Sequence, residues 1–426
     1  MLLQKISLFH SKREFFLFLG ICLFIAFYSL LIEYNNYKQL TQFDSALVDA
    51  TIIKQYQKTK LTKKGNQKTY QVLKLKSDKG FSFYTTVSKN FPNNNGNRIK
   101  LEIWIGKISF YEYINGFFAY NKIILIDDSP PLKKQLNLTI DSQHENQNIS
   151  AIYKALYTAT PLNYQLQSTF STLGISHLFA ISGFHLGVLS GLLFFLLKYP
   201  YSFLQNRYFP YRNSKRDIFF IVASVLLFYL LFLDSPDSLL RAFTMLVVGF
   251  FLYDRAIKII SMQTLFLTAI LLLAFFPKLL FSLGFWLSIS GVFYIFLFLI
   301  HFKYLSPIKQ FILLPIWVYI LMLPYSLVLF GNFSIYHPLS IIWTSLFTLF
   351  YPLSIFLHLA NLGNLLDSLL ENLIILGDKS IFVTIGVNFL VFHIFFSFLS
   401  IWRKRFLVLL LFFSSSILIY AINQIT

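Results

Sequence analysis

Residues 168–198 join an apolar run to three polar side chains, His177, Ser182 and His185. A helix of about 18 or more apolar residues is long enough to enter a bilayer. Imidazole and hydroxyl groups inside such a segment need partners or a water-filled cavity, so by default they mark a functional site. We therefore expect a membrane helix over these residues that carries a polar site along its first half.

Several further apolar runs of this kind occur along the chain, and hydrophobic residues make up 56% of it against 13% charged residues. This composition predicts a polytopic α-helical membrane protein. The first run, residues 15–32, follows Lys5, Lys12 and Arg13. We read residues 1–33 as a transmembrane anchor whose N-terminus lies in the cytoplasm, because basic residues collect on that side.

Residues 34–132 contain no run that could span a membrane. Short β-branched and aromatic stretches alternate there with turn-forming clusters at residues 63–66, 77–80 and 92–97. Five short strands in about a hundred residues predict an extracytoplasmic all-β domain with an OB-like barrel fold. Residues 133–167 then form a linker with amphipathic helices, and residues 168–426 form the polytopic domain.

The predicted β-domain and the linker are basic, because residues 34–150 hold 17 Lys and Arg against 9 Asp and Glu. Such an excess indicates an acidic partner, either nucleic acid or anionic lipid. The alternative is that these lysines only keep the domain soluble. The candidates for contacts to DNA are Lys63, Lys64, Lys74, Lys76, Arg98 and Lys100.

A second polar site joins two apolar segments at residues 234–242. Arg241 begins a run of a dozen mostly apolar residues, which is costly unless the guanidinium is paired or hydrated. It could form an ion pair with Asp234 or Asp237, or bind phosphate through its planar fork. The two alternatives stay open at this point.

Two features bear on the packing of the membrane helices. Gly183, Gly187 and Gly191 recur at every fourth residue, which predicts a close approach of a neighbouring helix. Near the C-terminus, Pro338 and Pro352 frame an apolar segment, and full passage of that segment would expose the basic residues 403–405 outside. We therefore expect a broken or re-entrant element at residues 338–357.

Four motifs of the chain resemble those of the bacterial competence DNA-uptake channels of the ComEC family. The first is the run S-H-L-x-A-I-S-G-x-H-L at residues 176–186, which is long and specific. The others are short but occur in the same order: P-x-S-x-x-R-A at 236–242, G-F-x-L-S at 284–288 and F-G-x-x-S at 330–334. Trp286 stands where the family commonly has glutamine, which weakens a pore-lining role there. Residues 98–118 also resemble the end of the OB-like domain of this family.

The resemblance implies an inner-membrane channel that passes single-stranded transforming DNA from periplasm to cytoplasm. Its implied partners are single-stranded DNA, membrane lipids, a periplasmic DNA receptor, a cytoplasmic motor or DNA-binding proteins, and, in a homo-oligomer, a second copy of the chain. The residues expected to line or shape the DNA path are His177, Ser182, His185, Asp234, Asp237, Arg241 and Asn332. Long members carry a metallo-β-lactamase-like domain after the helices, whose His-rich metal motif does not occur in this sequence. We expect no cofactor, no metal and no catalytic residue.

Two other functions remain open from the sequence. A lipid or small-solute transporter would also be polytopic, although no internal repeat of the kind common in transporters is visible. An intramembrane serine hydrolase would use Ser182 with a histidine base. His185 lies only three residues further on the same expected helix, so we expect its ring to reach Ser182 poorly.

Overall fold

The structure is a computed structural model of the protein. It describes residues 11–61, 67–92, 94, 96–127, 131–255, 260–377 and 381–424. The chain divides into two compact units. The helical unit comprises Met1–Leu19, Ser168–Leu272 and Ser282–Thr426, and the β unit comprises Gly20–Gln167 and Leu273–Phe281. The long helix α1 (Lys12–Leu40) begins in the first unit and ends in the second.

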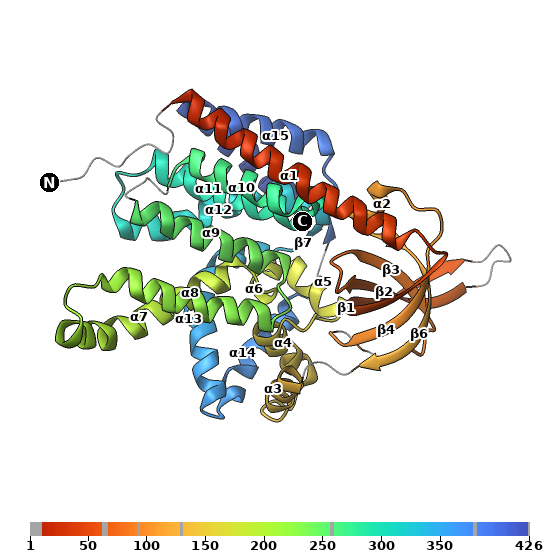
Figure 1. Cartoon of the computed structure of the whole chain (residues 1–426). Helices are drawn as coiled ribbons and strands as arrows, with labels where there is room; N and C mark the ends of the chain where they lie inside the picture. The colour runs from red at the N-terminus through yellow and green to blue at the C-terminus, as the bar shows by residue number, and fades with distance from the viewer. Residues whose placement is uncertain are drawn as a thin grey trace. The chain divides into compact units, whose positions relative to one another are not determined.

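The β unit is built on a sheet that has six strands over the described residues (Figure 1). The strands are β1 (Ser45–Leu61), β2 (Gln67–Ser77), β3 (Ser82–Val87), β4 (Arg98–Trp104), β5 (Phe117–Phe118) and β6 (Tyr120–Asp127), in the order β5-β3-β2-β1-β4-β6. Side chains alternate between the two faces of a strand. One face therefore collects the buried core, which includes Ile52, Leu73, Leu75 and Leu101, each with 0% of its surface exposed.

The two ends of this sheet are parts of one stretch of chain. β5 pairs in parallel with β3, whereas β6 pairs antiparallel with β4, and only Ala119 separates β5 from β6. The backbone N–H of Ala119 donates to the carbonyl of Tyr84, 2.9 Å away. Because the two edge strands are continuous, the sheet closes on itself, and closure removes exposed sheet edges.

A short helix between β4 and β5 covers one end of the barrel. α2 (Phe110–Asn115) begins with a capping box in which Ser109 and Glu112 exchange hydrogen bonds. The box satisfies two of the free N–H groups at the start of the helix, and the hydrogen bonds from Ser109 lower the pKa of Glu112. The helix places Tyr113, which is fully buried, against Phe81 in the barrel core.

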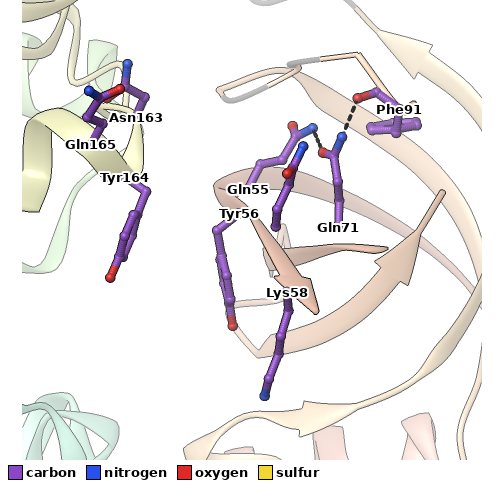
Figure 2. A pocket seen from close by; sticks show the side chains of 9 residues that line it. Gln55, Tyr56, Lys58, Gln71, Phe91, Asn163, Tyr164 and Gln165 are labelled. Carbon is purple, nitrogen blue, oxygen red and sulfur yellow. Dashed lines mark hydrogen bonds between the residues drawn. The ribbon is translucent and has the colours of Figure 1, made fainter. Parts of the chain in front are cut away.

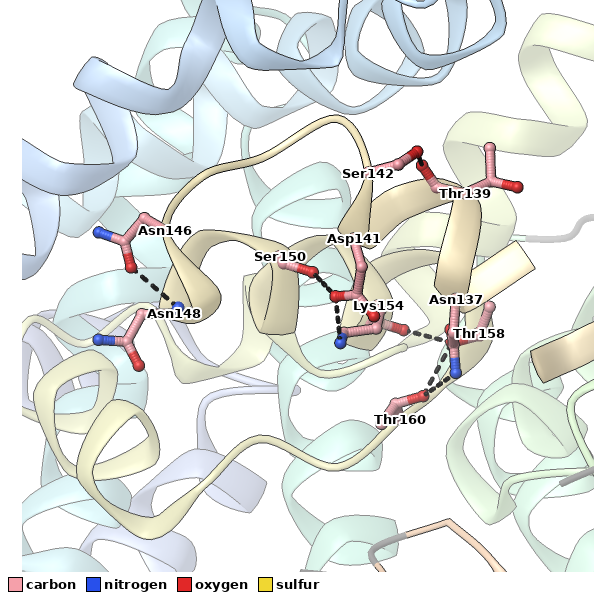
Figure 3. A network of polar contacts seen from close by, with 10 residues as sticks. All are labelled: Asn137, Thr139, Asp141, Ser142, Asn146, Asn148, Ser150, Lys154, Thr158 and Thr160. Carbon is pink, nitrogen blue, oxygen red and sulfur yellow. Dashed lines mark hydrogen bonds and ion pairs between the residues drawn. The ribbon is translucent and has the colours of Figure 1, made fainter. Parts of the chain in front are cut away.

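A helical hairpin follows the barrel within the β unit. α3 (Pro131–Asp141) and α4 (Gln147–Thr158) are joined by polar contacts (Figure 3). The carboxylate of Asp141 accepts hydrogen bonds from Ser150 and from the Lys154 ammonium, 2.6 Å away. Asn137 and Thr158 form a second link. These contacts fix the hairpin, and α4 leads directly into the segment that begins α5 (Tyr164–Thr172).

The helical unit consists mainly of apolar helices. In chain order these are α6 (Ser176–Phe179), α7 (Gly183–Tyr208), α8 (Ser214–Phe232), α9 (Asp237–Asp254), α10 (Met262–Phe275), α11 (Leu283–His301), α12 (Pro307–Phe330), α13 (Ser340–Leu359), α14 (Asp367–Leu376), α15 (Val387–Leu399) and α16 (Lys404–Asn423). Three 3-10 turns, η1 (Pro277–Phe281) in the β unit, η2 (His337–Leu339) and η3 (Gly363–Leu366), connect some of them. A short ribbon joins β7 (Asn332–Phe333) to β8 (Ile381–Phe382).

Six helical segments in the described part of the chain are long and apolar enough to cross a membrane. They are Lys12–Leu40, Gly183–Tyr208, Leu283–His301, Pro307–Phe330, His337–Leu359 and Lys404–Asn423. Large apolar side chains such as Phe24, which is 72% exposed, remain uncovered on these helices. Apolar surface of this extent marks contact with lipid or protein. The chain is therefore a multi-pass membrane protein, as the apolar runs predicted.

Of the broken or re-entrant element predicted at residues 338–357, the broken form is wrong, and the re-entrant form stays a prediction. The chain forms a continuous helix, α13, with Pro352 in its interior and the turn η2 before it. Proline costs a helix one backbone hydrogen bond, but neighbouring helices and side chains compensate for this loss in membrane helices. The segment is therefore long enough to cross a membrane without interruption.

Candidate functional site

Residues 168–198 do not form the single helix that was predicted. The first motif, residues 176–186, which we call the signature run, folds as parts of two helices with a break between them. The turn at Gly174, where φ is +70°, ends α5, and the one-turn helix α6 carries His177. The chain is extended at Ser182, where φ is −138°, and α7 begins at Gly183. His177 and His185 therefore lie on two different helices.

Ser182 and His185 form the N-terminal cap of α7. The backbone N–H of Ser182 donates to Nδ1 of His185 at 3.2 Å, and the Ser182 hydroxyl lies 3.1 Å from the same nitrogen. The prediction that the His185 ring reaches Ser182 poorly is therefore wrong, because Ser182 precedes the helix and the ring folds back over it. A first-turn side chain that returns to the cap residue is the geometry of a capping box.

The ring of His185 is enclosed by aromatic side chains of α13. Its centroid lies 5.2 Å from that of Phe347 and 4.8 Å from that of Tyr351, both in edge-to-face arrangement. His185 is 1% exposed, and its Nε2 atom has no hydrogen-bond partner among the described residues. A neutral ring whose Nδ1 accepts from Ser182 carries its proton on Nε2, so this N–H is a buried donor that faces the protein interior.

His337 lies just after the fourth motif, where its backbone N–H donates to the carbonyl of Ser334 at 3.0 Å, and it contacts the residue Gly174 just before the first motif. Its ring packs on Gly174 so closely that a Cβ built on Gly174 would lie 2.7 Å from Cε1 of the ring. The hydroxyl of Tyr319 lies 3.1 Å from His337 Nδ1, and His337 is 4% exposed. The exposed side chain of His177 lies 3.4 Å from the hydroxyl of Thr344 on α13, the helix whose Phe347 and Tyr351 enclose His185.

The second motif packs on the signature run at two points. The hydroxyl of Ser238 donates to the carbonyl of Ile181 at 2.7 Å. A Cβ on Gly183 would lie 3.1 Å from Cβ of Ala242, so the glycine permits close approach of α7 and α9. The structure does not show the predicted packing at Gly187 and Gly191, because a Cβ there would meet no described heavy atom within 4 Å.

Arg241 connects the second motif to the third. Its Nη1 donates to the carbonyl of Gly284 at 2.6 Å, and its guanidinium lies 5.8 Å from the centroid of the Phe285 ring. The side chain is 6% exposed, so the guanidinium is buried inside the helical unit. Asp234 is exposed in a left-handed turn with φ of +61°, and Asp237 is the first residue of α9, with its side chain outside the described atoms.

Residues of the first three motifs thus lie together with His337, which follows the fourth motif, although they are spread over more than 150 residues of sequence. We call this place the motif junction and define it by His177, Ser182, His185, Arg241, Gly284 and His337. Asn332, which was also predicted to line the DNA path, is close to His337 in sequence. It belongs to β7, where it pairs with Phe382. No described group of three or more His, Cys, Asp or Glu side chains could hold a metal ion.

The predicted DNA-binding residues occupy the outer face and the end of the barrel. Lys74 lies 5.6 Å from the centroid of the Tyr84 ring, and Lys76 follows two residues later on the same face of β2. Arg98 forms an ion pair with Asp78, and Lys100 is exposed opposite Asp49 of β1. Lys63 and Lys64 lie outside the described residues.

The helical unit also contains a buried polar network that was not predicted from the sequence. Nε2 of His393 on α15 lies 2.9 Å from the hydroxyl of Tyr294 on α11, which in turn lies 2.8 Å from Ser397. His393 and Tyr294 are both 0% exposed. A histidine within the apolar run 387–399 was the available signal, because a polar side chain in a membrane helix needs a partner on a neighbouring helix.

Comparison with known proteins gives the chain a family. Residues 159–425 match the model of a family described as competence protein. This range contains all six residues that define the motif junction and excludes the barrel. No curated protein and no solved structure matches the chain. A match over more than half of the residues is decisive, and it agrees with the resemblance of the four motifs: the chain belongs to the competence protein family.

Proposed function

We propose that this protein is the inner-membrane channel through which single-stranded transforming DNA passes from the periplasm to the cytoplasm. Membership of the competence protein family supports a role in DNA uptake. The six candidate membrane spans and the net charge of +18 agree with a conduit for a polyanion. The N-terminus lies in the cytoplasm in this proposal, and the barrel lies on the periplasmic side.

The observation that carries the proposal is the motif junction. A charge at the centre of a bilayer costs about 3 kcal/mol or more, so a polyanion can cross only through a hydrated path lined by polar groups. The junction gathers an exposed histidine, two buried histidines and a buried arginine among apolar helices. We infer that His177 lines this path and that Arg241 and His337 hold the helices around it in place.

The barrel of the β unit acts, in this proposal, as an OB-like module that receives DNA. Counting β5 and β6 as one interrupted strand gives five strands in a closed barrel, the number found in OB folds. OB folds bind oligonucleotides on the face of strands 2 and 3. The outer face of β2 and β3 presents Lys74, Lys76 and Tyr84.

The proposal requires partner proteins that move the DNA strand and deliver it to the channel. No P-loop sequence occurs, so a cytoplasmic motor or DNA-binding protein supplies the force that pulls the strand, and a periplasmic receptor delivers it. Contacts to phosphate release counterions, so DNA binding falls steeply with added salt. An affinity that does not change with salt would contradict the role of the barrel lysines.

A serine hydrolase remains the second candidate because of one distance, the 3.1 Å between the Ser182 hydroxyl and His185 Nδ1. A histidine within hydrogen-bond reach of a serine can act as its base. In this protein the same nitrogen also accepts the backbone N–H of Ser182, which occupies its lone pair. The contact is therefore better explained as a helix cap.

The test is transformation of a strain that lacks the protein. The channel proposal predicts that transformation falls to background, that wild-type protein restores it, and that growth on small solutes and lipid composition stay unchanged. Transformation at the wild-type frequency would overturn the proposal. A growth or lipid defect with normal transformation would favour a transporter.

A further inference from the structure

A pocket of about 710 Å³ opens in the β unit between strand β1 and the start of α5 (Figure 2). None of its residues belongs to the four motifs or to the motif junction. The residues that line it are Gln55, Tyr56, Gln57, Lys58, Gln71, Phe91, Asn163, Tyr164 and Gln165. The lining therefore combines aromatic rings and carboxamides with one cation.

Two tyrosines stand on opposite sides of this pocket. Figure 2 shows Tyr164 across the open space from Tyr56 and Lys58. Tyr164 is the first residue of α5, and the side chain of Asn163 caps this helix by accepting the N–H of Leu166 at 2.8 Å. The cap holds the backbone of Tyr164 in place, whereas its ring is 67% exposed. An exposed ring on a fixed backbone is suited to stacking against a flat ligand.

The floor of the pocket is rigid because its amides are paired with one another. Gln55 donates to Gln71 and to the carbonyl of Pro92, the latter at 2.9 Å. Gln71 donates to the carbonyls of Lys89 and Phe91 at 2.6 and 2.9 Å. Amides that are occupied in this way do not read the hydrogen-bonding edge of a ligand. The contacts to a ligand then come from the ring faces, from Lys58 and from the amides of Gln57 and Gln165.

The outer surface of the sheet carries the same kinds of side chain as the pocket, namely cations and aromatic rings. Lys54 on β1 pairs with Lys74 on β2, which pairs with Tyr84 on β3, so cations and a ring lie in one row across the barrel. Lys58, which lines the pocket, pairs with Tyr70 on β2 in the same sheet. A chain of flat and anionic units could follow this row away from the pocket.

We propose that the pocket is a stacking subsite for one or two bases of single-stranded DNA, held between Tyr56 and Tyr164, with Lys58 on the adjoining phosphate. Aromatic faces accept every base, whereas a duplex keeps its bases stacked inside and cannot offer them. The subsite therefore selects single strands without selecting sequence. This inference rests on the proposed function and adds to it the place where the strand is gripped before it reaches the channel.

The test uses full-length protein in lipid nanodiscs and a fluorescent oligothymidine of 20 residues, with affinity measured by anisotropy. Tyr56→Ala and Tyr164→Ala are each expected to weaken binding roughly 5- to 150-fold, the range covered by base stacking on one ring. Tyr56→Phe and Tyr164→Phe keep the ring and should bind like wild type. Tyr120→Ala, which removes a ring that is 71% exposed on β6, is the matched control outside the pocket.

A second readout locates the base directly. Oligonucleotides with 5-iododeoxyuridine are crosslinked by long-wavelength light to aromatic residues that stack on the base, and the attached peptide is identified by mass spectrometry. The subsite predicts adducts on Tyr56 or Tyr164, and it predicts that Lys58→Ala lowers the slope of log affinity against log salt by about one. A duplex of the same sequence should compete poorly.

The outcomes separate this inference from the channel proposal. Wild-type affinity in both alanine variants, with adducts elsewhere, overturns the subsite and leaves the channel untouched. Absence of oligonucleotide binding by the wild-type protein also overturns the subsite. Displacement of the oligonucleotide by a chitin oligosaccharide at similar concentration would instead identify a glycan site. Adducts on Tyr56 or Tyr164 in a protein whose loss leaves DNA import intact would support the subsite and refute the channel.

Discussion

The guanidinium of Arg241 donates a hydrogen bond from Nη1 to the carbonyl of Gly284, 2.6 Å away and 43 residues later in the chain. The bond ties the second motif to the third inside the helical unit. Arginine offers five donors in a fixed plane, so it can hold a carbonyl and still face an aromatic ring, here that of Phe285. The contact explains why an arginine stands among apolar residues at this position.

Replacement of Arg241 should disturb both stability and transport. Arg241→Gln removes a charged donor from a buried carbonyl, which should lower the free energy of unfolding by about 1.5–3 kcal/mol. Arg241→Lys keeps the charge but loses the planar fork, so it should restore only part of both properties. Arg255→Gln, on an exposed arginine, is the control. Thermal unfolding in detergent and transformation frequency are the measurements, and an Arg241→Gln protein equal to wild type would contradict this role.

Gly174 should tolerate no side chain. Its φ of +70° costs a non-glycine residue roughly 1–2 kcal/mol, and a Cβ would also collide with the His337 ring at 2.7 Å. We expect Gly174→Ala to lower the melting temperature, and Gly174→Ala with His337→Ala to recover the part caused by the collision. Gly187→Ala, inside α7 with no described atom within 4 Å of its Cβ, should be neutral or stabilising. Equal melting temperatures for the two single glycine variants would refute the contact.

Ser182 discriminates between a channel and a hydrolase. Loss of an N-cap hydroxyl typically costs about 1 kcal/mol, so Ser182→Ala should lower stability slightly and retain much of the transformation frequency. Ser182→Thr should restore the cap. A hydrolase would lose all activity in Ser182→Ala, and complete loss of transformation in a stably expressed Ser182→Ala protein would revive that alternative.

Tyr113 should give the β unit a dependence on alkaline pH. Its ring is fully buried, its hydroxyl lies 3.3 Å from the Glu33 carboxylate, and burial first and then the Glu33 charge raise the pKa of Tyr113. An unfolded tyrosine titrates near pH 10, so the stability from the neutral ring is complete below that pH and is lost as the pH rises through the higher folded pKa. Melting temperatures of wild type should therefore fall more steeply above pH 10 than those of Tyr113→Phe. Identical slopes would contradict the assignment.

The membrane topology can be mapped with single cysteines, because Cys22 is the one cysteine of the sequence. In a Cys22→Ser background, Tyr120→Cys lies on β6 and Tyr211→Cys lies between α7 and α8, at positions that are 71% and 84% exposed. A membrane-impermeant maleimide applied to cells with a permeabilised outer membrane should label position 120. Position 211, which has the basic residues Arg207, Arg212, Lys215 and Arg216 around it in sequence, should react only after the inner membrane is opened. The reverse pattern would refute the proposed orientation.

The membrane helices were predictable from sequence because apolar length is nearly sufficient to define them. The break in the signature run was not predictable, because residues 175–181 are apolar enough for a continuous membrane helix. Only Gly174 and Ser182, on either side of this stretch, indicate that the helix is interrupted. α2 could have been found, because Ser109 and Glu112 have the spacing of a capping box. The two-residue strand β5 has too little pattern to be seen, yet it closes the barrel.

The motif junction could not be derived from the order of the motifs. The order of motifs along the chain does not determine how far apart they lie in the folded protein. The contact between Gly174 and His337, for example, joins residues that are 163 positions apart in sequence. We predicted a functional role for His177, Ser182, His185 and Arg241 because a polar group inside an apolar membrane segment costs free energy unless it has a partner. His337 was not among the residues predicted to line the DNA path, because a histidine beside a turn looks solvated until its neighbours are known.

The most direct test follows fluorescent DNA in competent cells of the native host that lack this protein. If the protein is the inner-membrane channel, DNA foci still form in the periplasm, labelled DNA does not enter the cytoplasm, and wild-type protein restores entry. Unchanged entry of DNA into the cytoplasm of the deletion strain would contradict the account.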